Sequence, residues 1–241
     1  LVRFCKYPGQ PPLNFVVQGG WVKMSAPAPT VEKLALAFVD LPHRAVSMPV
    51  GEREDQTRYI LQTAAESGVD LIATRPEGDN ERILGQAWPF PSPFGVTVRT
   101  VSIAEGVDRV EARVRRSLER LGLPRGDTIL VSNANDLAGA EGRALWDRLT
   151  ALKSRGLFKR IGICLTMEDG PALMARRFMP DVVQMPCNIL DQRPVMHGVF
   201  DELASLDVDI HLASVFAGGL LFTSPENLPG ELIAHGQALS R

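Results

Sequence analysis

The sequence predicts an α/β barrel in which parallel strands alternate with helices. From residue 34 onward, short apolar runs alternate with helical patterns, which is typical of repeated βα units. The apolar runs show little polar alternation, as expected for strands that are covered on both faces. The length of 241 residues fits one such domain, since α/β barrels commonly take about 200–250 residues.

Seven strands are predicted, at 34–39, 70–74, 95–100, 128–131, 160–164, 182–185 and 209–214. No eighth unit follows them, because the sequence after Ser214 holds a loop with Pro and Gly and one short helical pattern over 230–239. We therefore predict a TIM-type (β/α)8 barrel that lacks its last βα unit. Either the chain is truncated, or another segment covers the open seam.

The clearest helix is predicted over 102–121. Its apolar residues repeat at three- and four-residue spacing, at Val107, Val110, Val114, Leu118 and Leu121. Gly122 stands where the helix should stop. The opposite face carries mixed charges, at Arg109, Glu111, Arg113, Arg116, Glu119 and Arg120. This pattern favours a solvent-exposed face over an anion-binding patch, because opposite charges at such spacings support a helix by themselves.

The N-terminal residues 1–30 are predicted as an extension ahead of the barrel domain at 31–241. Met24 is followed by Ser-Ala-Pro-Ala-Pro, so residues 1–23 are interpreted as an upstream extension. Residues 15–24 also read as two short β runs around Gly19 and Gly20, a pattern that favours a hairpin.

Composition excludes several classes of partner. The chain has 26 Lys and Arg against 28 Asp and Glu, a balance unlike that of a nucleic-acid-binding protein. Its longest apolar run, near 212–222, is shorter than the roughly 18 residues of a membrane span. Cys5, Cys164 and Cys187 are an odd set with no secretory signal, so we predict a cytoplasmic protein without a metal site. Its partners are then a small molecule, another protein or a second copy of the chain.

Seven segments, read in order, resemble one enzyme family. They lie at 66–72, 80–85, 117–122, 145–156, 159–163, 183–193 and 214–221. Together they resemble the aldo-keto reductases, (β/α)8 barrels that use NADPH or NADH, over about residues 34–228. The Asn-Ile-Leu-Asp-Gln-Arg run at 188–193 and the Ser-Val-Phe-x-x-Gly-Leu-Leu run at 214–221 most resemble a bacterial branch. That branch is associated with surface-polysaccharide, sialic-acid-like sugar and flagellin-modification genes.

The resemblance implies that the family's catalytic tetrad is not retained. In the family, a Tyr gives the substrate oxygen its proton, a Lys and an Asp tune that Tyr, and a His orients the substrate. The Asp and Tyr positions fall on Ala73 and Glu77, and the Lys and His positions fall on Arg99 and Ser132. The chain's tyrosines, Tyr7 and Tyr59, are not natural replacements. Its histidines are predicted to be structural or surface residues: His43, His197, His211 and His235.

The cofactor side of the resemblance survives in part. Gln184 matches the family Gln that holds the nicotinamide amide. Ser214, Gly218 and Leu220 match the loop near the pyrophosphate. The eighth-strand segment that binds the adenosine phosphate has no counterpart here, so binding of NADPH or NADH is expected to be weak or absent. Gln184 and Gly218 could instead have only structural roles at a barrel mouth.

Three charged residues are expected at the C-terminal face of the barrel, where barrel enzymes place their sites: Arg75, Glu77 and Arg99. The favoured interpretation is an ion pair between Arg99 and Glu77 that fills the space of the tetrad. The alternative is an anion site in which Arg75 and Arg99 hold a carboxylate or phosphate.

Three functions remain open from the sequence. The first is a reductase relative that has lost its chemistry and acts as a binding or partner protein in a bacterial sugar or polysaccharide pathway. The second is an active NAD(P)H-dependent oxidoreductase that reduces a sugar-type carbonyl, with Glu77 or a water as proton donor. The third is a structural subunit that docks through its open barrel seam.

Overall fold

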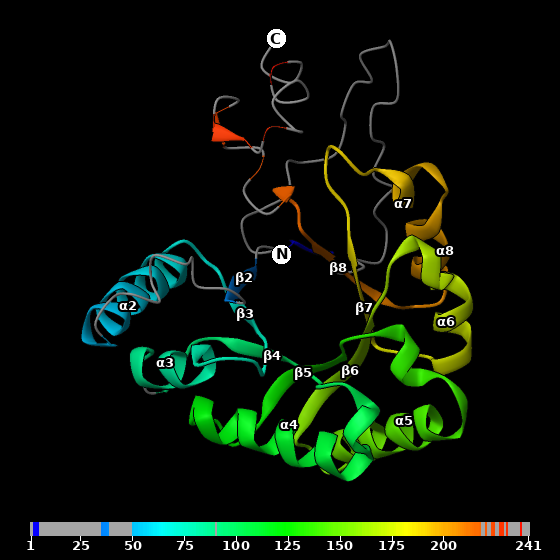
Figure 1. Ribbon diagram of the computed structural model, residues 1–241, viewed down its shortest axis with the longest axis horizontal. Coiled ribbons are helices and arrows are strands. Elements are labelled where there is room, and N and C mark those ends of the chain that lie inside the picture. Colours follow the sequence, from blue (N-terminus) through cyan, green and yellow to red (C-terminus); the bar gives the residue numbers. More distant parts are fainter. Residues whose placement is uncertain are drawn as a thin grey trace.

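A computed structural model describes residues 2–4, 35–38, 50–89, 91–217, 220, 223–224, 227–228, 230 and 237. Its central feature is a curved sheet with the strand order β1-β8-β7-β6-β5-β4-β3-β2 (Figure 1). The strands are β1 (Val2–Phe4), β2 (Ala35–Phe38), β3 (Leu71–Thr74), β4 (Gly95–Arg99), β5 (Gly126–Val131), β6 (Phe158–Cys164), β7 (Val182–Pro186) and β8 (Asp209–Ala213). Neighbours from β2 to β8 are parallel, and β1 runs antiparallel to β8.

The seven predicted strands are confirmed as β2 to β8, with bounds that differ by one or two residues. Within the described residues, no eighth parallel strand follows β8. Instead, β1 pairs with the free edge of β8, with Arg3 opposite His211. This short strand was not predicted, and it agrees with the alternative that another segment covers the seam. The predicted hairpin at 15–24 and most of the predicted helix at 230–239 lie outside the described residues.

Helices cover the convex side of the sheet (Figure 1). They are α2 (Val50–Glu66), α3 (Asn80–Ala87), α4 (Val107–Leu121), α5 (Gly139–Ser154), α6 (Pro171–Phe178), α7 (Arg193–Met196) and α8 (Val199–Ser205). Short 3-10 turns lie at Ile103–Glu105, Ala134–Leu137 and Met167–Asp169. No helix in this described part combines the length and apolar character that crossing a membrane requires.

The predicted helix at 102–121 is confirmed as α4, preceded by a 3-10 turn. It ends at Gly122, whose φ of 65° is the left-handed conformation that favours glycine. Its polar face forms ion pairs, such as that between Arg109 and Glu105 at 3.0 Å. Arg113 differs from this pattern, because its Nη2 donates to the carbonyl oxygen of Pro76 at 3.1 Å.

The two faces of the strands pack against different layers. Residues such as Ile72, Val98 and Ile163 are fully buried in the apolar core that the helices cover. The alternate residues face the inside of the curved sheet, because side chains alternate along a strand. The parallel register sets these inward residues side by side, with Arg99 beside Leu130 and Cys164 beside Gln184.

An ion-pair network lies at the end of the sheet where the parallel strands begin. Arg160 Nη1 donates to Asp209 Oδ2 at 3.0 Å, and Arg160 Nη2 donates to Asp127 Oδ2. Burial acts to raise the pKa of Asp127, but the bond and the charge of Arg160 hold this pKa below its usual 3.8. The network therefore compensates the charges at this end of the inward face.

Candidate functional site at the strand C-termini

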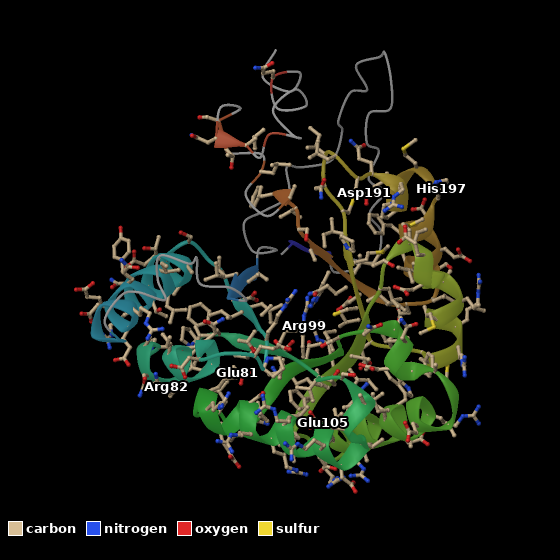
Figure 2. All side chains as sticks on the ribbon, in the orientation of Figure 1. Glu81, Arg82, Arg99, Glu105, Asp191 and His197 are labelled. Carbon is tan, nitrogen blue, oxygen red and sulfur yellow. The ribbon has the colours of Figure 1, made fainter. Side chains whose placement is uncertain are left out.

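Most of the sequence-predicted site residues lie where the parallel strands end. Arg99 and Cys164 end β4 and β6, and Gln184 lies within β7. Arg75 directly follows β3, and Ser132 directly follows β5. Because parallel strands end at one edge of a sheet, these residues share one face of the molecule. Figure 2 shows Arg99 pointing from β4 toward the inside of the curved sheet, whereas Glu81 and Glu105 lie on the helix side.

The central contact of this face joins Arg99 to Gln184. Arg99 Nη2 donates to Gln184 Oε1, and the thiol of Cys164 donates to the same oxygen at 3.7 Å. A guanidinium can only donate, so the amide oxygen must face Arg99 and the amide nitrogen must point elsewhere. Gln184 is 2% exposed, and its Nε2 has no hydrogen-bond partner within the described residues. Arg99 Nε is buried and also lacks a partner there.

The predicted ion pair between Arg99 and Glu77 is wrong. Glu77 is exposed, and no described residue forms an ion pair with it. The loop after β3 explains this result. Pro76 is buried, and its carbonyl oxygen accepts from Arg113 on α4, which fastens the loop toward the helix layer. Glu77 thus forms no ion pair with Arg99, and Arg99 donates to the amide oxygen of Gln184 instead.

Ser132 is fixed by the end of β4. Its hydroxyl donates to the carbonyl oxygen of Thr100, and its backbone N–H donates to Thr100 Oγ1 at 3.1 Å. The hydroxyl proton of Ser132 is thus committed to a backbone carbonyl. Thr100 was not singled out from the sequence, where nothing distinguishes it from other residues at strand ends.

Two arginines act on one thiol. Burial raises the pKa of the Cys164 thiol, and the positive charges of Arg99 and Arg75 oppose that rise. Both guanidinium groups therefore lie near enough to Cys164 to influence its charge state. Burial also raises the pKa of Cys187, and the charge of Asp191 adds to this effect. Neither cysteine is a ready thiolate, in agreement with the sequence-based expectation that both behave as small apolar residues.

The predicted pyrophosphate loop is described only in part. Ser214 has a φ of 54°, and its carbonyl oxygen accepts from Asn188 Nδ2 at 3.0 Å and from the backbone N–H of Ala217 at 2.8 Å. These bonds join the loop after β7 to the turn after β8. Leu220 is half-buried, and Gly218 lies outside the described residues.

The histidines divide between the sheet and the surface. His211 is fully buried on β8, directly beside Gln184 in the parallel register. Its place next to the site was missed, although the two-residue periodicity of the 209–214 strand could have indicated it. His197 is exposed at the end of α7, and His43 and His235 lie outside the described residues. Within the described part of the chain, no group of His, Cys, Asp and Glu could hold a metal ion.

Two surface hollows lie away from the strand C-termini. One is lined by helical residues that include Trp146 and Lys153, and by Met179 directly after α6. The other includes Arg58 and Trp88 and lies beside α2 and α3. Neither contains a predicted site residue, so the hydrogen-bond pattern defines the candidate site.

Residues 100–230, more than half of the chain, match the model of the aldo/keto reductase family. The chain belongs to this family. A Pseudomonas aeruginosa protein assigned to the aldo-keto reductases is 22% identical, with a TM-score of 0.58 over 75% of this chain and 72% of that one. A Bombyx mori aldo-keto reductase in complex with NADP is 18% identical, with a TM-score of 0.58 over 75% of this chain and 62% of that one.

A variant of the protein Gox0644 in complex with NADPH is 17% identical, with a TM-score of 0.58 over 86% of this chain and 70% of that one. At these identities the likeness to solved structures shows the fold alone. A search of curated proteins gives no significant match. The fold and the family are thus established, and the chemistry depends on the site itself.

The contacts of Gln184 test whether the site fits a nicotinamide. The carboxamide of that ring has both an acceptor oxygen and donor N–H groups. Gln184 Nε2 is an unpartnered donor that suits the oxygen. Gln184 Oε1, which would accept from the N–H groups, is occupied by Arg99 and Cys164. The site in this arrangement therefore does not fit a nicotinamide amide held on both sides.

Proposed function

We propose that this aldo-keto reductase relative no longer reduces carbonyls and acts as a binding protein. The observation that carries the proposal is the bond between Arg99 and Gln184. The family resemblance places a proton-tuning Lys at Arg99 and a nicotinamide contact at Gln184. A single hydrogen bond joins the two side chains to each other, and so diverts both from those tasks.

Within the described residues, the lack of a proton donor at the tetrad positions supports the same conclusion. The tetrad positions hold Ala73, whose side chain cannot transfer a proton, and the exposed Glu77, which does not contact Arg99. The Ser132 hydroxyl is bonded to a backbone carbonyl. Tyr59 is 73% exposed on α2, in the helix layer and not at the strand ends that form the site. General acid catalysis contributes typically 10²–10⁴-fold, so its absence removes much of the family's rate.

A second function is favoured by one observation. The unpartnered Gln184 Nε2 is a buried donor that a nicotinamide carboxamide oxygen could use. If Arg99 swung away, Gln184 would recover its acceptor, and Glu77 or a water would have to supply the proton. This alternative is an NAD(P)H-dependent reductase with a rearranged site.

The setting we propose is a bacterial sugar or polysaccharide pathway. Support comes from the runs at 188–193 and 214–221, which resemble the branch associated with such pathways. In the structure, Asn188 from the first run bonds to the carbonyl of Ser214 from the second. The two runs that carry the resemblance thus form one connected rim beside the site.

The deciding experiment measures loss of reduced-nicotinamide absorbance with NADPH and NADH over a panel of sugar and simple aldehydes. The parent chain is compared with Glu77→Gln, which removes the carboxylic acid of the alternative mechanism. Glu105→Gln is the matched control, because Glu105 is also exposed but lies in the 3-10 turn before α4. Calorimetric titration with both cofactors runs in parallel.

We expect oxidation of the cofactor at the rate seen without protein, and weak or undetectable cofactor binding. Saturable turnover that scales with protein concentration would overturn the proposal. A loss of about a hundredfold or more in Glu77→Gln, with Glu105→Gln unchanged, would then assign Glu77 as the proton donor.

A further inference from the structure

The inward face at the strand C-termini carries positive charge that no carboxylate among the described residues pairs with. Arg99 is half-buried, and its hydrogen bond within the described residues goes to a neutral amide. Arg75 is exposed and forms no ion pair with any residue of the described ranges. The opposite end of the same face differs, because Arg160 there bonds to both Asp127 and Asp209. Within the described part of the chain, the charge at the C-terminal end is thus left without an ion-pair partner.

The groups left unpaired on this face are N–H donors. Arg99 Nε and Gln184 Nε2 are buried without partners in the described part of the chain. A guanidinium carries five N–H donors and no acceptor, and an amide nitrogen adds two more donors. The one acceptor between these side chains, Gln184 Oε1, is already used by Arg99 and Cys164. Such a donor set suits an anion and repels a cation.

Gln184 gives the site a fixed element. Gln184 is only 2% exposed. The bond from Arg99 sets the orientation of its amide, with Oε1 facing Arg99 and Nε2 pointing elsewhere. The unpartnered Nε2 is therefore a built-in donor at a set position on β7. Buried donors are rarely left unpaired in native proteins, and an unpaired one commonly marks a missing ligand or water.

We propose that Arg99, Gln184 and Arg75 form a binding site for a small anion, a carboxylate or phosphate compound. This inference rests on the proposed binding function and names the ligand class. Arg99 supplies the central charge, and Gln184 holds that guanidinium while offering its own N–H. Arg75, at the exposed end of β3, neutralises the remaining charge. The influence of both arginines on the Cys164 thiol supports their convergence on one region.

The test is calorimetric titration of the full chain with inorganic phosphate and, separately, with malonate. These two arms distinguish a phosphate ligand from a carboxylate ligand. The variants are Arg99→Ala, Arg99→Lys and Arg75→Ala. Arg109→Ala is the matched control, because it removes the same charge from an exposed arginine that pairs with Glu105 on the helix side.

We expect saturable binding of at least one probe that weakens as salt is added. Arg99→Ala should weaken binding at least about tenfold, because it removes the charge-assisted hydrogen bonds to the anion. Arg99→Lys should retain part of the affinity, because lysine keeps the charge but loses the planar fork. Arg75→Ala should weaken binding less, and Arg109→Ala should bind as the parent does.

Two results would overturn the site. One is the absence of saturable binding of both probes at millimolar concentrations. The other is unchanged affinity in Arg99→Ala. If Arg99→Ala fails to fold, the anion affinities of Gln184→Leu and Arg75→Ala test the site instead. Affinity equal to that of the parent in both variants would refute the proposal. Carbonyl turnover would refute the proposed loss of reductase activity but would not change the anion titration. The two proposals can therefore fail independently.

Discussion

Gly162→Ala is expected to destabilise the barrel, because the inward face of β6 has no room for a methyl group. A Cβ at Gly162 would lie 2.3 Å from the carbonyl oxygen of Val182 and 2.7 Å from Leu130 Cδ2. The first atom is backbone of the neighbouring strand, and Leu130 is fully buried on the other side. The Val182 carbonyl cannot move without disturbing the ladder that also places Gln184, and the buried Leu130 side chain would have to repack.

The expected size of the effect follows from two opposing contributions. Overpacking a core costs typically about 1–3 kcal/mol. Replacing Gly by Ala restricts the unfolded chain and returns about 0.4–1 kcal/mol. The free energy of unfolding should therefore fall by about 1–2 kcal/mol. For a chain of this length, that corresponds to a fall in Tm of roughly 2–8 °C.

Urea unfolding followed by circular dichroism measures this change. Gly51→Ala is the matched control, because Gly51 is exposed in α2 and a Cβ there would meet nothing within 4 Å. That variant should be as stable as the parent or more stable, by up to about 1 kcal/mol. A Gly162→Ala chain as stable as Gly51→Ala would refute the packing argument for the inward face.

Three further predictions concern stability. Arg160→Ala should cost about 3 kcal/mol in urea unfolding, because it removes the partly buried cation that bridges Asp127 and Asp209, whereas exposed Arg176→Ala should cost under about 1 kcal/mol; equal losses would contradict this. Burial raises the pKa of Glu81 above its usual 4.5, so the folded chain holds this proton more tightly than the unfolded chain does. The contribution of Glu81 to the parent's free energy of unfolding should therefore fall as pH rises from 4.5 through that raised pKa. The unfolding free energy of Glu81→Gln should lack this fall; a pH-independent difference from the parent would contradict the prediction. Gly122→Ala should lower Tm through a cost of about 1 kcal/mol, because φ there is 65°, and an unchanged Tm would argue against strain.

The parallel strands could be predicted because a strand that is buried on both faces is apolar along its own sequence. Runs such as 129–131 are continuously apolar, as expected for strands covered by helices. β1 was missed because three residues carry no periodicity, and its position depends on the free edge of β8. The stop of α4 was predicted because Gly122 provides a local signal, namely tolerance of a positive φ.

The site was predicted as a set of positions, but its pairing was not. Charge complementarity favoured Arg99 with Glu77, which are 22 residues apart in the sequence. The actual partner, Gln184, lies 85 residues from Arg99 and reaches it through the inward faces of β4 and β7. That choice depends on the buried Pro76 carbonyl and its bond to Arg113, which set the direction of the loop that carries Glu77. A hydrogen bond between a loop and a distant helix depends on the tertiary structure, so local sequence patterns do not predict it.

The arginines at the two ends of the inward face have different partners, and this difference predicts that a bound anion stabilises the folded chain. Arg160 has two carboxylate partners at one end, whereas Arg99 at the other has a neutral amide. A partly buried guanidinium without an anion is unfavourable, so an anion that binds Arg99 should stabilise the folded chain. By mass action, ligand at 100 times its Kd adds about 2.7 kcal/mol to the free energy of unfolding.

Thermal unfolding of the parent in phosphate or malonate should therefore shift upward by several degrees. Arg99→Ala should show only the general salt effect, measured with chloride at matched ionic strength. Because that variant has already lost the uncompensated charge, its Tm without ligand should fall less than the loss of a paired arginine such as Arg160 would cause. If chloride raises the Tm of the parent as much as phosphate and malonate do, the prediction is wrong, and water rather than a bound ligand solvates the charge of Arg99.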